Sequence, residues 1–350
     1  MKAAILGANG YTGLVLTRLL LQHPDIDSVV ASSRSLTGTA IADYDHGLAP
    51  QALAKKCRET HGRYIAPEDV PSHSPDVVFS ALPHLASADF CAAYQNKCPV
   101  IDLSADFRLR SDERFAASYG QNRPHPELQD KAVYGLTEWY RDEISKADLI
   151  ASPGCYPTSV LLPLIPILAQ GLAGGTITAN AMSGITGAGK KAQTNLLFAE
   201  RCENMGAYLP GRSHRHWNEM SQEIEAFSQG AAPKLLFTPH LIPAKQGMLA
   251  TISLELSDKK ITQDELFALL TNAYESSPLV TVLPPGTLPQ TKAVRGTGRC
   301  LIGLQLEGDH LLLFSAIDNL YKGAASQALQ AMNIRFGFQE TAGIPVFGEI

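Results

Sequence analysis

The chain has 350 residues, enough for two domains with their own cores, and its 45% hydrophobic and 18% charged residues are those of an ordinary folded protein. A net charge of −5 without a long basic run excludes nucleic acid as an expected partner. The longest apolar run, SVLLPLIPILAQGL, is too short to span a bilayer, so we expect no membrane partner either.

The cysteines and the first residues predict the compartment. Met1-Lys2 leads directly into a predicted strand, without the pattern of a signal peptide. The six cysteines are scattered, with no CxxC and no paired spacing. In a chain of this size that pattern indicates reduced thiols, so we expect a cytoplasmic protein.

Residues 1 to about 150 alternate short apolar runs with helical patterns. The helical patterns cover 13–23 and 85–97. The alternation predicts a parallel sheet covered by helices, which is the Rossmann-type α/β architecture. The predicted strands are 2–8, 27–33, 76–82, 99–104 and 148–152.

The first predicted strand ends in the turn GANGYTG. Gly7, Gly10 and Gly13 allow a tight turn and a close approach of the backbone to a pyrophosphate. The helix that follows would offer its unpaired N–H groups to the phosphates. The strand–turn–helix context therefore predicts a dinucleotide site, in preference to a tight turn that binds nothing.

The end of the second strand indicates which dinucleotide binds. An NAD site places a carboxylate about 20 residues after the turn, whereas this chain has Ser32, Ser33 and Arg34 there. Hydroxyls and a guanidinium suit a 2′-phosphate, so we predict NADP(H). The alternative is that Arg34 is a solvated loop charge.

From about 152 the predicted strands become longer, and 300–306 and 310–317 have hairpin spacing. This pattern predicts a second, α+β domain with a mixed or antiparallel sheet. We place the domains at 1–152 and 153–318, with a last helical segment from 319, and expect a small-molecule site at their boundary. The predicted helices of the second domain are 158–171, 189–204, 217–228 and 262–275.

Cys155 lies at that boundary, in SPGCYPT. If a helix begins near Tyr156 to Ser159, the thiol lies at or just before its N-cap. The partial positive charge of a helix N-terminus stabilises a thiolate. The other five cysteines lack this setting, so Cys155 is either a nucleophile or filler at a buried corner.

A thiolate beside a nicotinamide can hold an acyl group as a thioester that accepts a hydride, and this chemistry needs a proton shuttle. Among the histidines, His214 and His216 in SHRHWNEM are the best candidates, and one of them is expected to be structural. The HxH spacing has no nearby ligand partners, so we expect no metal.

The segment GITGAGKK, 184–191, also fits the GxxxxGK pattern of a nucleoside-triphosphate loop. Lys191 stands where Mg²⁺ binding needs serine or threonine, which disfavours a kinase or NTPase.

Together these motifs resemble the N-acetyl-γ-glutamyl-phosphate reductase family, which acts in arginine biosynthesis and is related to aspartate-semialdehyde dehydrogenase. The resemblance runs over essentially the whole chain. It implies NADPH-dependent reduction of an acyl phosphate to a semialdehyde, with Cys155 as nucleophile and His216, in preference to His214, as acid/base. The motifs that carry it are GANGYTG, LPH, DLSADFRL, YGLTE, SPGCYPT, SGITGAGK, HRH and IDNLYKGAASQALQAMN.

The resemblance also implies the fold and the residues that contact ligands. The second domain would be a catalytic and dimerisation domain of the glyceraldehyde-3-phosphate dehydrogenase-like type, a C-terminal helix over 319–350 would pack back on the first domain, and the chain would form a homodimer or homotetramer. The implied cofactor contacts are Gly7, Asn9, Gly10, Tyr11, Thr12, Gly13, Ser33, Arg34, Leu82, Pro83, Ser183, Gly184 and Asn319. The implied substrate contacts are Arg108, Tyr156, Lys190, His214 and Arg215.

Three alternatives share some of these features. Aspartate-semialdehyde dehydrogenase has the same architecture and chemistry but a shorter substrate. Some relatives reduce carrier-protein-bound acyl phosphates instead. A dinucleotide-sensing regulator would need only the glycine turn, and the pairing of Cys155 with a histidine argues against it.

Overall fold

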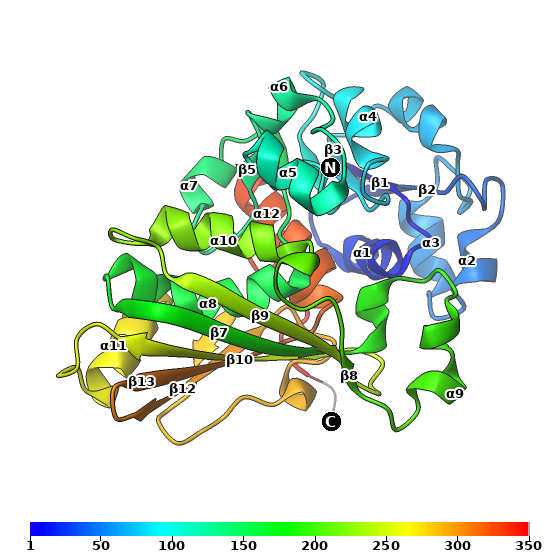
Figure 1. Cartoon of the computed structure of the whole chain (residues 1–350). Coiled ribbons are helices and arrows are strands. Elements are labelled where there is room, and N and C mark those ends of the chain that lie inside the picture. The colour runs from blue at the N-terminus through cyan, green and yellow to red at the C-terminus, as the bar shows by residue number, and fades with distance from the viewer. Residues whose placement is uncertain (349–350) are drawn as a thin grey trace. The chain divides into compact units, whose positions relative to one another are not determined.

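The computed structural model describes residues 1–348 and divides into two units (Figure 1). The first unit comprises Met1–Asp112, Gln121–Pro153 and Ala324–Ile344. The second comprises Glu113–Gly120, Gly154–Gly323 and the residues from Pro345. The chain thus passes between units after Pro153 and Gly323, where we had predicted boundaries after 152 and 318, and a short helical segment near 113–120 joins the second unit.

The first unit contains a parallel sheet, as predicted. Among the described residues it has six strands in the order β2-β1-β3-β4-β6-β5, and every pair of neighbours is parallel. The pattern missed β5, which is only two residues long. The strands are β1 Lys2–Leu6, β2 Ser28–Ser32, β3 Val77–Ser80, β4 Val100–Asp102, β5 Val133–Tyr134 and β6 Leu149–Ala151.

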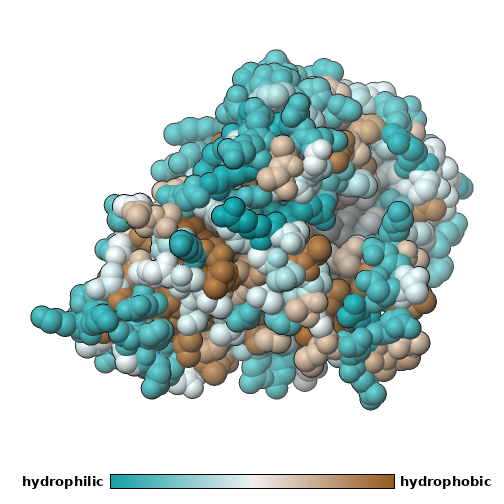
Figure 2. Space-filling view, viewed as in Figure 1, coloured by the Kyte–Doolittle hydropathy of each residue, from teal (hydrophilic) through white to brown (hydrophobic). Residues whose placement is uncertain are grey.

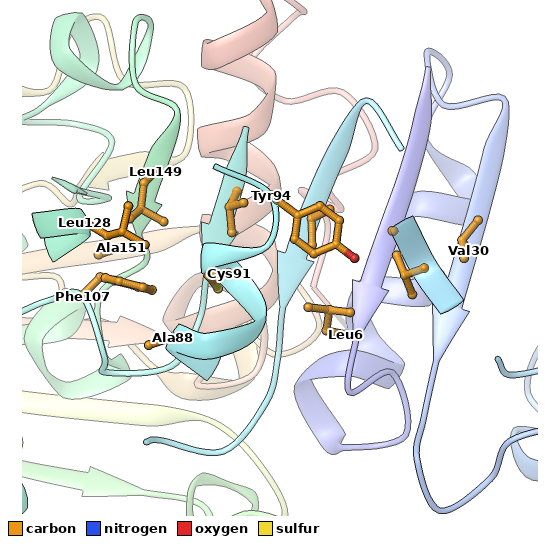
Figure 3. Packing of buried hydrophobic residues seen from close by; sticks show 13 residues of the cluster. Leu6, Val30, Ala88, Cys91, Tyr94, Phe107, Leu128, Leu149 and Ala151 are labelled. Carbon is orange, nitrogen blue, oxygen red and sulfur yellow. The ribbon is translucent and has the colours of Figure 1, made fainter. Parts of the chain in front are cut away.

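Apolar side chains between this sheet and its helices form the core of the first unit. Figure 3 shows Leu6 and Val30 from the strands on one side of this core and Leu128 and Leu149 on the other, with Cys91 between them. These side chains are buried because each strand is covered by helices, which explains the continuous apolar runs in the sequence. The helices of this unit are α1 Tyr11–Gln22, α2 Ile41–Tyr44, α3 Pro50–Lys56, η1 Pro67–His73, α4 Ser87–Ala92, α6 Pro126–Gln129, α7 Arg141–Ile144 and α12 Ser326–Phe336.

Two predicted helices of this unit are shorter than expected. The helix predicted over 85–97 is only α4, and its continuation is a series of turns in which Asn96 has a φ of 59°. The helix predicted over 319–350 is a π-helical turn at Tyr321–Ala325 followed by α12. Gly337 ends α12 in the left-handed conformation, which glycine adopts without strain. Residues 349–350 of that prediction lie outside the described residues. Within the first unit α12 contacts α1, α7 and β4.

The glycine turn joins β1 directly to α1. Gly7 has a φ of +80°, and Gly10 is the N-cap of α1. A methyl group on Gly13 would lie 2.4 Å from the carbonyl oxygen of Gly7 and 2.7 Å from Cα of Ala8. The helix can therefore approach the strand this closely only with glycine at position 13.

Replacing Gly13 with alanine is expected to lower the free energy of unfolding by about 3 kcal/mol, because backbone atoms must move to admit the methyl group. Gly10→Ala is the matched control, since its methyl group would lie 3.7 Å from the nearest atom, the Gly7 carbonyl oxygen. Its expected loss is at most about 1 kcal/mol, the usual range for a cap position. Urea unfolding of both variants tests this difference, and equal stabilities would contradict it.

The second unit contains a mixed sheet, as predicted. Within residues 1–348 it has seven strands in the order β11-β12-β13-β10-β7-β9-β8. β10 pairs antiparallel with both β7 and β13, while β7 and β9 are parallel. The hairpin predicted over 300–317 is β12 and β13. The strands are β7 Ala173–Ser183, β8 Gly206–Ala207, β9 Lys234–Leu241, β10 Met248–Leu256, β11 Val280–Val282, β12 Cys300–Glu307 and β13 His310–Ile317.

The apolar run of the sequence forms the central helix of the second unit. It is the helix α8, Cys155–Ala169, which packs on β7, β10 and β13 and against α10. Nearly all of α8 is buried, so its hydrophobicity reflects a core position. No helix of the described residues is both long enough and apolar enough to cross a membrane. The other helices are α5 Asp112–Tyr119, α9 Phe198–Arg201, α10 His216–Phe227 and α11 Gln263–Ala273, with short 3₁₀ turns at η2 Ile185–Ala188, η3 Thr194–Leu196, η4 Gly211–Ser213 and η5 Thr291–Ala293.

The helix predicted over 189–204 is wrong. The segment forms only η3 and the single turn α9, and its side chains are almost all exposed. Gly189 begins it with a φ of +84°, and the apolar side chains of Leu197 and Phe198 are exposed, so burial of one face does not stabilise a longer helix. The glycine segment 184–191 contains η2, and the next element is the 3₁₀ turn η3, so the segment lacks the loop-to-helix geometry of a nucleoside-triphosphate site.

Candidate functional site

Cys155 is the first helical residue of α8, and Gly154 is its N-cap. The predicted start at 158 was three residues late, and the thiol lies at the helix N-terminus. No side chain caps this end, and the first turn carries no acidic residue. Cys155 is half-buried, unlike Cys57, Cys91 and Cys300 in the cores. A negative charge on its sulfur is stabilised by the positive end of the helix dipole.

His216 lies directly against the residue before the nucleophile. A methyl group on Gly154 would lie 2.5 Å from Nε2 of His216 and 2.7 Å from its Cε1. His216 is also the first residue of α10, so the N-termini of α8 and α10 meet here. The structure thus brings His216 against the glycine that precedes Cys155, and the catalytic roles of the two residues stay a prediction.

His214 has a different environment from His216. Its Nδ1 accepts a hydrogen bond of 3.1 Å from the backbone N–H of His216. The rings of Tyr156, Tyr208 and Phe237 surround it, with their centres 5.4 to 5.5 Å from the centre of the imidazole. This burial, with a smaller contribution from Arg215, lowers the pKa of His214 to about 4. His214 is therefore neutral near pH 7 and holds the start of α10.

Two tyrosines complete the wall behind the histidines. Tyr208 donates a hydrogen bond of 2.9 Å from its hydroxyl to that of Tyr156, which in turn donates to the carbonyl of His240 at 3.4 Å. Burial raises the pKa of both phenols, that of Tyr208 to about 12. Both hydroxyls therefore stay protonated, and Tyr156 lies next to Cys155 in a fully buried position.

The second unit also holds the three residues predicted at the nicotinamide. Asn319 is buried, accepts the N–H of Gly247 at 2.8 Å and donates to the hydroxyl of Thr186 at 3.0 Å. Ser183 donates to the carbonyl of Gly184 at 3.0 Å. These contacts gather Ser183, Gly184 and Asn319 around the end of β7.

The chain that follows Asn319 returns to the nucleophile. The N–H of Gly323 donates to the carbonyl of Asp318 at 2.9 Å. A methyl group on Gly323 would lie 2.7 Å from Cβ of Cys155. The turn 318–323 therefore links the Asn319 group to the cysteine.

The predicted cations of the second unit lie at its surface. Arg215 is exposed and its guanidinium lies 5.6 Å from the ring centre of Tyr119, in a cation–π arrangement. Lys190 is exposed in the loop after η2. Both remain candidates for binding an anionic substrate.

In the first unit, the predicted dinucleotide residues lie at the carboxyl ends of the parallel strands. Gly10, Tyr11, Thr12 and Gly13 form the start of α1, which has no side-chain cap and no acidic residue in its first turn. Asn9 lies beside the end of β2, because its side chain donates to the hydroxyl of Ser35 at 3.2 Å. This end of the helix suits an anion.

The loop after β3 lies beside the glycine turn. A methyl group on Gly7 would lie 2.8 Å from the carbonyl oxygen of Ala81 and 3.3 Å from the side chain of Leu82, which Pro83 follows. β1 and β3 are neighbours, and the chain returns from β2 on the other side of β1. Such a switch point is where open parallel sheets bind nucleotides.

Arg34 lies just beyond β2, next to the buried Ser33. Its guanidinium pairs with the carboxylate of Glu68 at 3.1 Å, with both side chains largely exposed, and it lies 5.7 Å from the ring centre of Phe90. An exposed ion pair of this kind is weak, so Arg34 can exchange Glu68 for a phosphate.

Arg108 is buried within the first unit. Its Nε donates to the carbonyl of Ser152 at 2.7 Å and one of its terminal nitrogens donates to that of Leu103 at 2.9 Å. These bonds tie the loop after β4 to the end of β6. A role of Arg108 toward a substrate phosphate remains a prediction.

Three residues at Cys155 were missed or left without a role in the sequence analysis: Tyr208, Glu219 and Gly323. They contact the residues around Cys155 from segments far apart in the chain, so no local pattern could predict them. For Glu219 alone, its position three residues after His216 in HRHWNE could have indicated that the two are neighbours on a helix. Glu219 is 2% exposed, and its carboxylate accepts the N–H of Gly154 at 2.8 Å.

The sequence matches two family descriptions. Residues 2–147 match the semialdehyde dehydrogenase NAD binding domain, and residues 155–319 match the semialdehyde dehydrogenase dimerisation domain. Together they cover most of both units.

Curated relatives align over nearly the whole chain. An N-acetyl-γ-glutamyl-phosphate reductase of Neisseria gonorrhoeae (strain NCCP11945) is 41% identical, covering 98% of this chain and 97% of the relative. Enzymes of the same name from Thiobacillus denitrificans and Synechocystis are 40% and 39% identical over at least 97% of each chain.

Solved structures show the same fold at lower identity. Aspartate semialdehyde dehydrogenase II of Vibrio cholerae has a TM-score of 0.71 and 17% identity, covering 96% of this chain and 98% of that one. An aspartate semialdehyde dehydrogenase of Candida albicans, solved with NADP, has a TM-score of 0.66 and 17% identity over 95% and 97% of the two chains. At this identity the likeness concerns the fold alone.

Proposed function

The chain belongs to the N-acetyl-γ-glutamyl-phosphate reductase family of semialdehyde dehydrogenases, and we propose that it reduces N-acetyl-L-glutamyl 5-phosphate to N-acetyl-L-glutamate 5-semialdehyde and phosphate in arginine biosynthesis. The observation that carries the proposal is the juxtaposition of Cys155 and His216 at the N-terminus of α8. The curated relatives carry this name at about 40% identity, whereas the aspartate-semialdehyde dehydrogenases are related in fold.

The residues of the first unit fit NADP(H). The uncapped start of α1 suits the pyrophosphate, and Ser33 and Arg34 at the end of β2 suit a 2′-phosphate, which a carboxylate at that place would repel. Ser183, Gly184 and Asn319 are assigned to the nicotinamide. When bound, NADPH supplies the hydride of the reaction.

Cys155 forms the covalent intermediate. Its thiolate attacks the acyl carbon, a carbon–sulfur bond forms, and the carbon–oxygen bond to phosphate breaks to give a thioester. The oxygen of the tetrahedral intermediate carries a negative charge, which the N-terminus of α8 stabilises. Pro157 occupies the third position of α8 and has no N–H, so the donors there are those of Cys155 and Tyr156.

His216 handles the proton at the same carbon's oxygen. After reduction, the hemithioacetal oxygen takes up a proton from Nε2 of His216 and returns it as the carbon–sulfur bond breaks. The aldehyde leaves and the thiolate of Cys155 is restored. His214 does not serve this role, because its Nδ1 accepts the N–H of His216 and its low pKa keeps it neutral.

The substrate carries a phosphate and a carboxylate, so it needs cations around it. Arg108, Lys190 and Arg215 are assigned to these groups, and Tyr156 and His214 to the acyl chain. The exposed position of Arg215 and Lys190 allows them to reorganise when the substrate binds.

We propose that the chain is a homodimer or homotetramer assembled through its second unit, and that it acts in the cytoplasm, where Cys155 stays reduced. The helices α8 and α11 pack on one face of the mixed sheet, and the other face carries half-buried side chains such as Leu249 and Phe314. Hydrophobic surface is visible where β9 and the β8–α9 region lie (Figure 2). The exposed large apolar side chains there are Leu197, Phe198, Met205, Leu209 and Leu236.

The reaction is tested in the reverse direction. We expect NADP⁺ reduction with N-acetylglutamate semialdehyde that requires phosphate, because the thioester must be released as acyl phosphate. Aspartate semialdehyde and NAD⁺ are the matched alternatives, each expected to give a kcat/KM at least about 100-fold lower, the order expected when a site's polar groups are left unpaired. Equal rates with aspartate semialdehyde, or rates independent of phosphate, would refute the proposal.

A further inference from the structure

A buried carboxylate holds the turn that carries the nucleophile. Glu219 extends from α10, and its Oε1 accepts the N–H of Gly154 at 2.8 Å. The two residues are 65 positions apart in the chain, and Glu219 is 2% exposed. The bond therefore joins the start of α8 to the first turn of α10.

His216 and Glu219 contact Gly154 from the same turn of α10. His216 precedes Glu219 by three residues, so both side chains project from the same side of α10 toward Gly154. Nε2 of His216 would contact a methyl group on Gly154 at 2.5 Å, while Glu219 holds the N–H of the same residue. One glycine is thus contacted by two groups from one helix turn.

Helix α10 is itself fixed from both ends. At its start, His214 accepts the N–H of His216. Along its length, Asn218 donates to the hydroxyl of Ser118 at 2.8 Å, and Glu225 pairs with Arg114 at 2.5 Å, both partners lying on α5. A carboxylate on a helix held in this way can set the position of the glycine turn that it contacts.

We propose that Glu219 is a positioning residue for the reaction, which holds Gly154 so that the thiol of Cys155 and the imidazole of His216 meet the same substrate atom. The inference rests on the proposed function. The position of the Glu219 acceptor oxygen matters for this role, and its negative charge does not, because a hydrogen bond from the uncharged N–H of Gly154 needs only an acceptor at this distance. The negative charge by itself would oppose a thiolate nearby.

Two substitutions separate reach from charge. Glu219→Gln keeps an acceptor oxygen at the same distance and removes the charge. Glu219→Asp keeps the charge and withdraws the oxygen by one methylene, out of hydrogen-bond range of the Gly154 N–H. Glu275→Gln is the control, because Glu275 is an exposed carboxylate of the same unit that takes no part in holding α10. Circular dichroism and thermal unfolding establish that each variant is folded.

We expect Glu219→Gln to keep kcat within about fivefold of the parent chain and Glu219→Asp to lose about 100-fold in kcat with a small change in KM, since a displacement of about 1 Å at reacting groups costs this much. Glu275→Gln should match the parent chain. The rate of iodoacetamide modification of Cys155 at pH 7.5, followed by mass spectrometry of the peptide that contains Cys155, should fall in Glu219→Asp and not in Glu219→Gln.

The proposal requires that Glu219→Gln has both a higher kcat and a faster alkylation of Cys155 than Glu219→Asp. The reverse order would assign the role to the charge, and equal behaviour of the two variants would show that the bond does not position the turn. Alkylation of Cys155 does not depend on turnover. If the chain lacked the proposed activity, the alkylation order of the two variants would still test the positioning.

Discussion

Replacing Cys155 with alanine is expected to lower kcat by at least about 10⁴-fold, because the covalent thioester can no longer form and only binding and charge stabilisation remain. The cofactor should still bind, since the glycine turn and Arg34 belong to the first unit and are untouched. Alanine also fits the start of a helix, so the fold should be retained.

Steady-state kinetics and NADPH fluorescence titration check the two halves of this expectation. Cys202→Ala is the matched control, because Cys202 is an exposed cysteine of the same unit and should be dispensable. Cys155→Ser keeps an oxygen nucleophile of much higher pKa and should be nearly as slow as alanine. Turnover by Cys155→Ala above about 1% of the parent rate would exclude the thioester mechanism.

The second large effect concerns the two histidines, which should behave differently. His216→Asn is expected to lower kcat by about 10²- to 10⁴-fold, the usual contribution of a general acid or base. His214→Asn should lose less than about tenfold, because an asparagine oxygen can still accept the N–H of His216 and cap α10.

The pH dependence gives an independent check. Burial lowers the pKa of His214 to about 4, so its protonation would lie well below the range of the assay. The shape of the kcat profile should therefore be unchanged in His214→Asn. A profile that changes shape in His214→Asn and not in His216→Asn would reverse the two roles.

His214 also has a consequence for stability. Its folded pKa lies below the value of about 6.5 in an unfolded chain, so the unfolded state binds more protons between these values. The free energy of unfolding is therefore expected to be highest above pH 6.5 and to decrease as the pH falls toward 4, which thermal unfolding at a series of pH values would measure. The decrease arises because the buried imidazole must stay unprotonated to accept the N–H of His216.

The sequence by itself determined the features that depend on neighbouring residues. The glycine turn lies between β1 and α1 because strand pattern, glycines and helix pattern follow one another directly. Cys155 begins a helix because a glycine precedes it and an apolar run follows it. The parallel and mixed sheets were also predictable, since continuous apolar runs and hairpin spacing are local patterns.

Only the tertiary structure decided how the site is assembled. The difference between His214 and His216 arises from what surrounds each ring, and the sequence places them two residues apart with equal chemistry. The bond from Gly154 to Glu219 joins positions 65 apart, and the exposed segment after Gly189 formed no long helix because no surface was there to bury it. Such contacts depend on distances of a few tenths of an ångström between elements that pack together only in the folded chain, and no local pattern encodes them.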